Sequence, residues 1–357
     1  MPNPALISED VDNPVIVRLR QEDTAALDQL LADGWDPNAK IEIGMMNVRP
    51  IDVALTENLK IAINYLLDFG VELSDSESPA ILYAAPRCST EVISRLIGMG
   101  ADVNQTSRLG RTVVQSAIYY ERFDLISFFL DNGFEVNRDE GRSFRSVVDS
   151  GRLELVELFV EQGVDLELFK PDMVYPYNSS PCHVAARHSL ELVQYLVSQG
   201  ANPSHNDLFG YRPFHTAKNN EIREFLRTLE PQAWHDTEEI SKRLHQLSLP
   251  KDLIDFLSSS DRSLTVDHEY VKILEFSDLA NVRFNNWKGR EFVDLLAAVK
   301  VQSMQDRSVI EDFGTSAGIV VWFIEEQVIG QADYEHEEIR EVGGWNAFRN
   351  NPAKLFN

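Results

Sequence analysis

Residues 180–204 read SPCHVAARHSLELVQYLVSQGANPS, one complete copy of a unit that recurs through the first two thirds of the chain. Pro181 suits the first turn of a helix, because its fixed φ fits that position and its missing N–H would have no helical partner there. Val193 and Leu196 belong to one buried stripe of a second helix. Gly200 ends that helix, since a residue without Cβ adopts positive φ cheaply. The unit is therefore predicted to be a pair of helices.

Each copy of the unit ends in a glycine that follows two apolar residues and two variable ones. These glycines lie 36, 30, 33, 30 and 37 residues apart, at Gly34, Gly70, Gly100, Gly133, Gly163 and Gly200. An apolar residue stands three positions before each apolar pair, at Leu27, Ile63, Ile93, Ile126, Val156 and Val193. A period of about 33 residues predicts a repeat architecture in which each helix pair packs only on its neighbours.

A second signature precedes the first helix of several copies. Residues 180–186 read SPCHVAA and residues 211–217 read YRPFHTA. With the period, they make the chain resemble the ankyrin-repeat proteins, whose motif is T-P-L-H-x-A. The resemblance covers Leu19 to Leu229 as about seven units. The first unit is expected to lack its front half and the last to lack its glycine, as capping repeats do.

The resemblance implies a stack of helix pairs with finger-like turns, whose fingers and first helices form a concave surface that holds other proteins. It also implies that the array is not catalytic. The fingers would be residues 42–47, 105–108, 168–177 and 206–211. Adaptable, aromatic or cationic side chains on such loops are typical interface anchors. The predicted partner-binding residues are Met45, Met46, Arg108, Tyr175, Tyr177, Phe209 and Tyr211. The alternative is that such side chains cover the tops of the helix stack.

The period stops near residue 231, and the remaining residues suffice for a separate domain. The pattern predicts helices over residues 237–257, broken at Pro250 as the first helical residue, and over residues 286–298. Strand-like runs are residues 270–276, 309–310, 318–324 and 328–332. The expected organisation is an N-terminal extension (residues 1–18), an ankyrin-repeat array (19–230) and an α+β domain (231–357). The fold class is thus mainly α: a solenoid of helix pairs followed by a smaller α+β domain.

The C-terminal part is similar to the SUKH (Smi1/Knr4-like) superfamily, which includes bacterial immunity proteins that neutralise toxins. The matching segments are LPKDLIDFL at residues 249–257, VIEDFG at 309–314, the strand at 319–324, DYEHE at 333–337 and the closing stretch 345–356. The family's glycine-rich aspartate turn is incomplete, because Gly314 is its only glycine here. The resemblance implies a non-catalytic inhibitor of another protein.

Composition narrows the choice of partner and compartment. The 33 Lys and Arg residues against 57 Asp and Glu residues give a net charge of −24, which repels nucleic acid and anionic membranes. No apolar run approaches the roughly 20 residues that span a bilayer, and the N-terminus lacks the pattern of a secretory signal. The two cysteines, Cys88 and Cys182, fit a reducing compartment. We therefore expect a cytoplasmic protein.

Three patterns resemble catalytic or metal sites. Residues 314–318 fit a G-x-S-x-G elbow, but an apolar strand-like run follows where that motif needs a helix. His183 and His215 occupy the motif position whose ring bonds the adjoining turn. Glu335, His336, Glu337 and Glu338 could ligate a metal, but they lack metal-ligand spacing, so we expect a solvated acidic turn. We predict no catalytic residue, no metal site and no cofactor.

The leading hypothesis is a non-catalytic module that binds a protein partner, and the acidic charge favours a basic one. Its sharper form is an immunity protein that blocks a toxin. Two alternatives remain: a general scaffold or adaptor, and a hydrolase with its site in the C-terminal domain.

Overall fold

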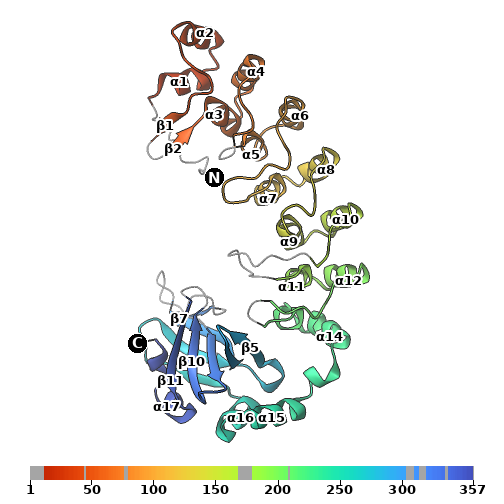
Figure 1. Ribbon diagram of the computed structural model, residues 1–357, viewed down its shortest axis with the longest axis vertical. Helices are drawn as coiled ribbons and strands as arrows, with labels where there is room; N and C mark the ends of the chain where they lie inside the picture. The colour runs from red at the N-terminus through yellow and green to blue at the C-terminus, as the bar shows by residue number, and fades with distance from the viewer. Residues whose placement is uncertain are drawn as a thin grey trace. The chain divides into compact units, whose positions relative to one another are not determined.

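The computed structural model describes residues 12–43, 46–75, 79–167, 179–207, 210–302, 309–312, 319–333 and 337–356. The chain divides into two compact units (Figure 1). Unit 1 comprises residues 1–170 with 194–201, and unit 2 comprises residues 171–193 with 202–357. The helix α12 (Leu190–Ser198) is shared between them.

Unit 1 is built of successive helix pairs. Its helices are α1 (Pro14–Arg20), α2 (Thr24–Ala32), α3 (Pro50–Glu57), α4 (Lys60–Phe69), α5 (Ala80–Ala84), α6 (Thr90–Gly98), α7 (Val113–Tyr119), α8 (Asp124–Asp131), α9 (Arg142–Asp149) and α10 (Leu153–Glu161). The first helices pack in sequence, α1 on α3, α3 on α5, α5 on α7 and α7 on α9, and each also contacts the second helix of its own pair. In Figure 1, α3, α5, α7 and α9 follow one side of the unit and α4, α6, α8 and α10 the other.

The glycines end their helices as predicted. All six repeat glycines have positive φ, from 74° at Gly163 to 101° at Gly200. The expectation that the first unit lacks its front half is wrong. Helix α1 supplies that half, because Asn13 caps it, Pro14 starts it, and Ile16 and Leu19 are fully buried.

Helices α3 and α7 each start with a cap in which the side chain of the third helical residue accepts the N–H of the residue before the helix. In α7, Thr112 N donates to Gln115 Oε1 and Gln115 N donates to Thr112 Oγ1, both at 3.1 Å. At the start of α3, Asp52 takes the same role: it accepts from Arg49 N at 3.1 Å and pairs with the Arg49 guanidinium at 2.7 Å. Both side chains of this pair are 2% exposed. The copies at residues 49–54 and 112–117 therefore keep this hydrogen bond, although they have lost the histidine of the motif.

Unit 2 begins with the last repeat helices. They are α11 (Pro181–Ala186), α13 (Pro213–Thr216) and α14 (Asn220–Leu229), followed by the short helix η2 (Gln232–Trp234), α15 (Thr237–Gln246) and α16 (Lys251–Ser258). Helix α11 packs on α13, and α13 on α14. The predicted break at Pro250 is confirmed, although Pro250 caps α16 instead of being its first residue.

Two antiparallel sheets follow. In the described residues, β11-β10-β9-β6-β5 form one sheet and β3-β4-β7-β8 the other. The strands are β3 (Ser263–Thr265), β4 (Val271–Phe276), β5 (Arg283–Trp287), β6 (Arg290–Asp294), β7 (Leu296–Gln302), β8 (Val309–Asp312), β9 (Ile319–Phe323), β10 (Val328–Asp333) and β11 (Glu338–Gly343), with η3 (Leu279–Asn281) before β5. Helix α17 (Trp345–Asn350) and η4 (Pro352–Leu355) close the chain. One hydrophobic core joins side chains of both sheets with α15, α16 and α17, Trp322 and Trp345 being its largest members.

The helix predicted over residues 286–298 is wrong. This segment holds the end of β5, all of β6 and the start of β7. The two-residue turn Lys288-Gly289 joins β5 to β6, and both residues have positive φ, 52° and 78°. That geometry matches the twist of paired strands, so the segment folds as a hairpin.

Substitutions at Gly100 and Gly98 are expected to change the free energy of unfolding in opposite directions. Gly100 has φ +100°, where a Cβ costs about 1–2 kcal/mol. Gly98 ends α6 with an ordinary helical φ and has nothing within 4 Å of an added Cβ. Gly100→Ala therefore destabilises the repeats, and Gly98→Ala stabilises them by about 0.5 kcal/mol. Urea unfolding followed by far-UV circular dichroism measures both, and equal shifts of one sign would contradict the glycine role.

His183 is expected to make stability depend on pH. Ser180 N donates to its Nδ1 at 3.1 Å, so Nε2 carries the proton and donates to Tyr211 O at 2.7 Å. Burial lowers the pKa of His183 from 6.5 to about 3. Between these values the unfolded chain binds a proton that the folded chain does not, so His183's contribution to stability is lost as pH falls below 6.5.

His183→Gln tests this dependence, because Gln115 makes the equivalent cap bond in α7. The variant loses the Tyr211 bond and about 1 kcal/mol at neutral pH. Its free energy of unfolding should then fall less steeply with acid, by up to about 1.4 kcal/mol per pH unit. Urea titrations at about pH 5 and about pH 7 give the slope. An unchanged slope would show that His183 already binds a proton in the folded state.

Candidate functional site

The turns that precede the first helices, here called fingers, carry the candidate site in unit 1. The finger before α3 is a hairpin of β1 (Ile41–Ile43) and β2 (Met46–Val48). The finger before α7 ends in a tight turn, in which Gly110 N donates to Ser107 O at 2.7 Å and Ser107 N donates to Arg111 O at 3.0 Å. Both fingers lie where the repeat pattern predicts them.

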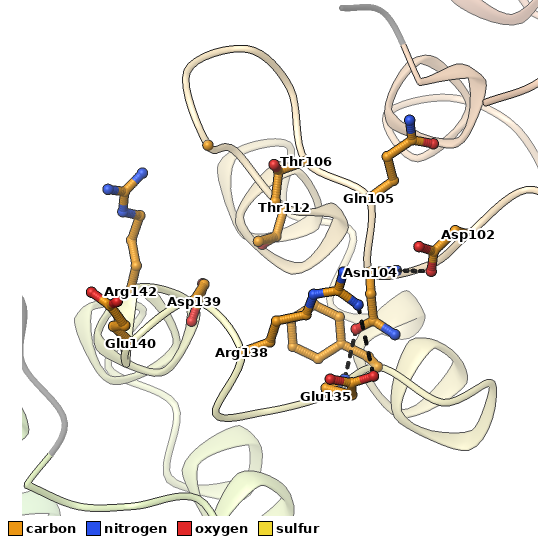
Figure 2. A pocket seen from close by; sticks show the side chains of 12 residues that line it. Asp102, Asn104, Gln105, Thr106, Thr112, Glu135, Arg138, Asp139, Glu140 and Arg142 are labelled. Atoms are coloured by element: carbon orange, nitrogen blue, oxygen red, sulfur yellow. Dashed lines mark hydrogen bonds and ion pairs between the residues drawn. The ribbon is translucent and has the colours of Figure 1, made fainter. Parts of the chain in front are cut away.

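A pocket of about 500 Å³ lies between the finger before α7 and the finger before α9 (Figure 2). Its lining residues are Asp102, Asn104, Gln105, Thr106, Gly110, Thr112, Phe134, Glu135, Arg138, Asp139, Glu140 and Arg142. Four carboxylates thus face two guanidinium groups, and Figure 2 shows one of these, Arg138, directed at Glu135. Acidic side chains therefore outnumber basic ones in the lining of the pocket.

Asparagine side chains hold the successive fingers in register. Asn104 Nδ2 donates to Gly133 O at 2.8 Å, and its Oδ1 accepts from Glu135 N at 2.8 Å. Asn137 repeats this bridge one unit later, to Gly163 O and from Asp165 N. Each bridge satisfies a carbonyl at a helix end and an N–H of the next turn. The Asn104 side chain therefore holds the two walls of the pocket together through hydrogen bonds to the backbone.

The finger tip is held from the next repeat. Arg142 Nη1 donates to Leu109 O at 3.3 Å. An added Cβ on Gly110 would lie 2.6 Å from that same Nη1, so the position admits only glycine without a shift of Arg142. Below it, Asp139 Oδ2 accepts from Ser143 N at 2.7 Å, and burial raises the pKa of the Asp139 carboxyl.

Three exposed side chains belong to the finger before α7 and to α7 itself. Leu109 is 74% exposed at the finger tip, Tyr119 is 68% exposed at the end of α7, and Arg108 is exposed between Ser107 and Leu109. Arg108 was among the predicted partner-binding residues, whereas Leu109 and Tyr119 were not. Tyr119 could have been found as an aromatic residue outside the buried positions of its helix.

The other predicted binding residues lie elsewhere. Met45, Tyr175, Tyr177 and Phe209 lie outside the described residues, and Met46 is placed only as the first residue of β2.

Tyr211 lies in unit 2 on the finger before α13, half-buried. The Arg283 guanidinium of β5 covers its ring at 3.9 Å. Asn285, also on β5, lies 3.5 Å from where a Cβ on Gly210 would stand. The aromatic face of Tyr211 is thus engaged within the chain, and its role in binding a partner remains a prediction.

Burial or hydrogen bonds explain the two motif histidines and the two cysteines as parts of the fold. His183 is buried and makes the cap described above, and His215 makes the matching bond, accepting from Arg212 N at 3.0 Å. Cys88 and Cys182 are buried, and burial raises the pKa of the Cys88 thiol to about 11. Residues 314–318 lie outside the described part, but the segment that follows them is the strand β9, not the helix that a nucleophile elbow needs.

In the part of the chain that the structure describes, no group of three or more His, Cys, Asp or Glu side chains could hold a metal ion. None of the described helices combines the length and apolar character that crossing a membrane requires.

Two curated proteins are similar to part of the chain. The mitochondrial disaggregase of Bos taurus is 27% identical over 158 residues, which is 43% of this chain and 23% of that protein. The ankyrin repeat and SAM domain-containing protein 6 of Danio rerio is 28% identical over 173 residues, which is 46% of this chain and 23% of that protein. The chain thus spans less than a quarter of the length of these relatives.

Solved ankyrin structures align with the repeats. The human ASB11 ankyrin repeat domain aligns with a TM-score of 0.48 and 17% identity, over 61% of this chain and 98% of that one. The ankyrin repeat domain of Bcl-3, a member of the IkappaB family, aligns with a TM-score of 0.49 and 21% identity, over 61% of this chain and 100% of that one.

Family models match two stretches directly. One, described as ankyrin repeats (many copies), matches residues 81–130, and another, described as ankyrin repeat, matches residues 177–208. The first stretch contains the finger before α7 and one wall of the pocket. Ankyrin repeats are in general non-catalytic modules of protein interaction. This chain therefore carries ankyrin repeats, and its pocket lies between two of their fingers.

Proposed function

We propose that the chain binds a protein partner on the finger side of unit 1, at the pocket between the fingers before α7 and α9. The observation that carries the proposal is the pocket itself, about 500 Å³ in volume, together with the exposed Leu109 at the tip of one of its fingers and the exposed Tyr119 at the end of α7. Tyrosine and leucine in such positions add apolar area that only a partner can bury. The asparagine bridges fix the fingers before binding, which lowers the entropic cost of association.

We propose further that this partner is basic overall. The net charge of −24 attracts cationic proteins at long range, and the pocket offers four carboxylates against two guanidinium groups. Complementary potentials of this kind speed encounter and select partners.

The sharpest form of this proposal is immunity: the chain neutralises a toxin by covering a cationic surface such as a nuclease groove. Its support is the acidic charge together with the SUKH-like motifs of residues 249–257 and 309–314. The alternative is an adaptor that gathers several unrelated partners on the same repeats.

A photo-cross-linker at Thr106 tests where the partner binds. Thr106→p-benzoylphenylalanine places the reactive group in the pocket, and Phe69→p-benzoylphenylalanine is the matched control on α4. Phe69 is 52% exposed, so the control also presents an exposed aromatic ring. Both proteins are irradiated in lysate of the organism that encodes the chain, at low and high salt, and cross-linked proteins are identified by mass spectrometry.

We expect one basic protein to cross-link at Thr106, less at high salt because screening weakens the attraction, and not at Phe69. Identical products from both positions, or none from Thr106, would contradict the proposed surface. Several unrelated products at Thr106 alone would favour the adaptor.

A further inference from the structure

Four side chains of the repeat that contains α7 are here called the finger patch: Arg108, Leu109 and Arg111 on the finger, and Tyr119 at the end of α7. Leu109 and Tyr119 are 74% and 68% exposed, Arg108 is exposed and Arg111 is half-buried. The Arg111 guanidinium lies over the Tyr119 ring, 5.2 Å from its centroid. The patch therefore combines two apolar side chains with two cations on one finger and its helix.

The finger patch is a cationic exception in an acidic chain. The chain has 57 acidic residues, yet residues 103–120 contain none and include Arg108 and Arg111. Within the described residues, neither arginine pairs with a carboxylate. Several other arginines of unit 1 do, among them Arg49 with Asp52, Arg95 with Asp68, Arg122 with Asp124 and Arg152 with Glu154. Two guanidinium groups thus remain available to a carboxylate from outside the chain.

The chemistry of the patch defines what it can hold. Burying Leu109 and Tyr119 requires an apolar side chain from the partner. That contact excludes water from the neighbouring arginines, and a guanidinium in a drier environment binds a carboxylate through strong paired hydrogen bonds. A partner cation beside Arg108 and Arg111 would instead meet like charge.

The patch is also rigid before it binds. Leu109 stands on the turn closed by Ser107 and Gly110, and Arg142 holds its carbonyl from the next repeat. Little backbone freedom is lost when a partner docks on such a turn.

We propose that the finger patch binds a partner segment in which one apolar side chain is flanked by carboxylates. This inference rests on the proposed function and adds the chemistry of the contact. The net negative charge of the chain attracts a partner that is basic overall. The segment of that partner that contacts the finger patch is acidic. The alternation of acidic pocket and cationic patch then fixes the register of the partner along the array.

A displayed library of random peptides probes the patch without knowledge of the natural partner. The full chain is used to select peptides, in parallel with Arg108→Glu/Arg111→Glu and with Arg18→Glu/Lys60→Glu as control. The control changes the net charge equally at exposed positions on α1 and α4. Circular dichroism and thermal melting confirm that all three chains fold alike.

We expect peptides with Asp or Glu next to Leu, Phe or Trp to be enriched on the unaltered chain and on the control. They should be lost on the patch variant. By fluorescence anisotropy, the best peptide should bind the patch variant about 100-fold more weakly, because two ion pairs are replaced by repulsion. Tyr119→Ser, which keeps both arginines, should also weaken it.

Enrichment of basic peptides, equal binding to the patch variant, or no enrichment on the unaltered chain would each overturn the inference. These outcomes leave the proposed function intact if the Thr106 cross-link still forms. If the Thr106 cross-link does not form but acidic peptides still bind in a patch-dependent way, the pocket is not the binding site proposed above, and the inference about the finger patch stands.

Discussion

The side-chain bridge from one finger to the next is the constraint on which the candidate site depends. Asn104 and Asn137 each bind a carbonyl at a helix end and an N–H of the following turn. These backbone groups need partners, and no helix or strand supplies them at those points. The Asn104 bridge joins the two fingers that flank the pocket and so holds its walls together, and the Asn137 bridge continues the same link to the next unit.

The sequence was informative wherever a backbone conformation restricts the residue type. Positive φ at the end of each second helix demands glycine, so the period could be read from Gly34 to Gly200 despite the loss of most motif residues. The cap at the start of the first helices was harder to recognise. Asp52, Gln115 and His183 all accept the same kind of N–H bond, and residues so different show no common motif. The same hydrogen bond can therefore recur from repeat to repeat without a common residue type.

Prediction failed where tertiary context decides. Residues 286–298 contain apolar residues at spacings that a helix would also accept, and only the positive φ at Lys288 and Gly289 selects a hairpin. In the candidate site, loop position was enough to name Arg108. It could not reveal Leu109 and Tyr119, because their exposure depends on what the neighbouring repeats leave uncovered. The predictions at Met45, Tyr175, Tyr177 and Phe209 lie on segments that the structure does not describe.

The contact of β5 with the last finger has a consequence for assembly. At Gly110, the neighbour of the finger tip is Arg142 of the following repeat, whereas at Gly210 it is Asn285 of β5. The strand therefore occupies the place where one more repeat would begin. A stack of like units with a bare end can add another copy of itself, and such head-to-tail addition does not close. By covering that end of the last repeat with its own strand, the chain leaves no bare surface at that point on which a further copy could stack.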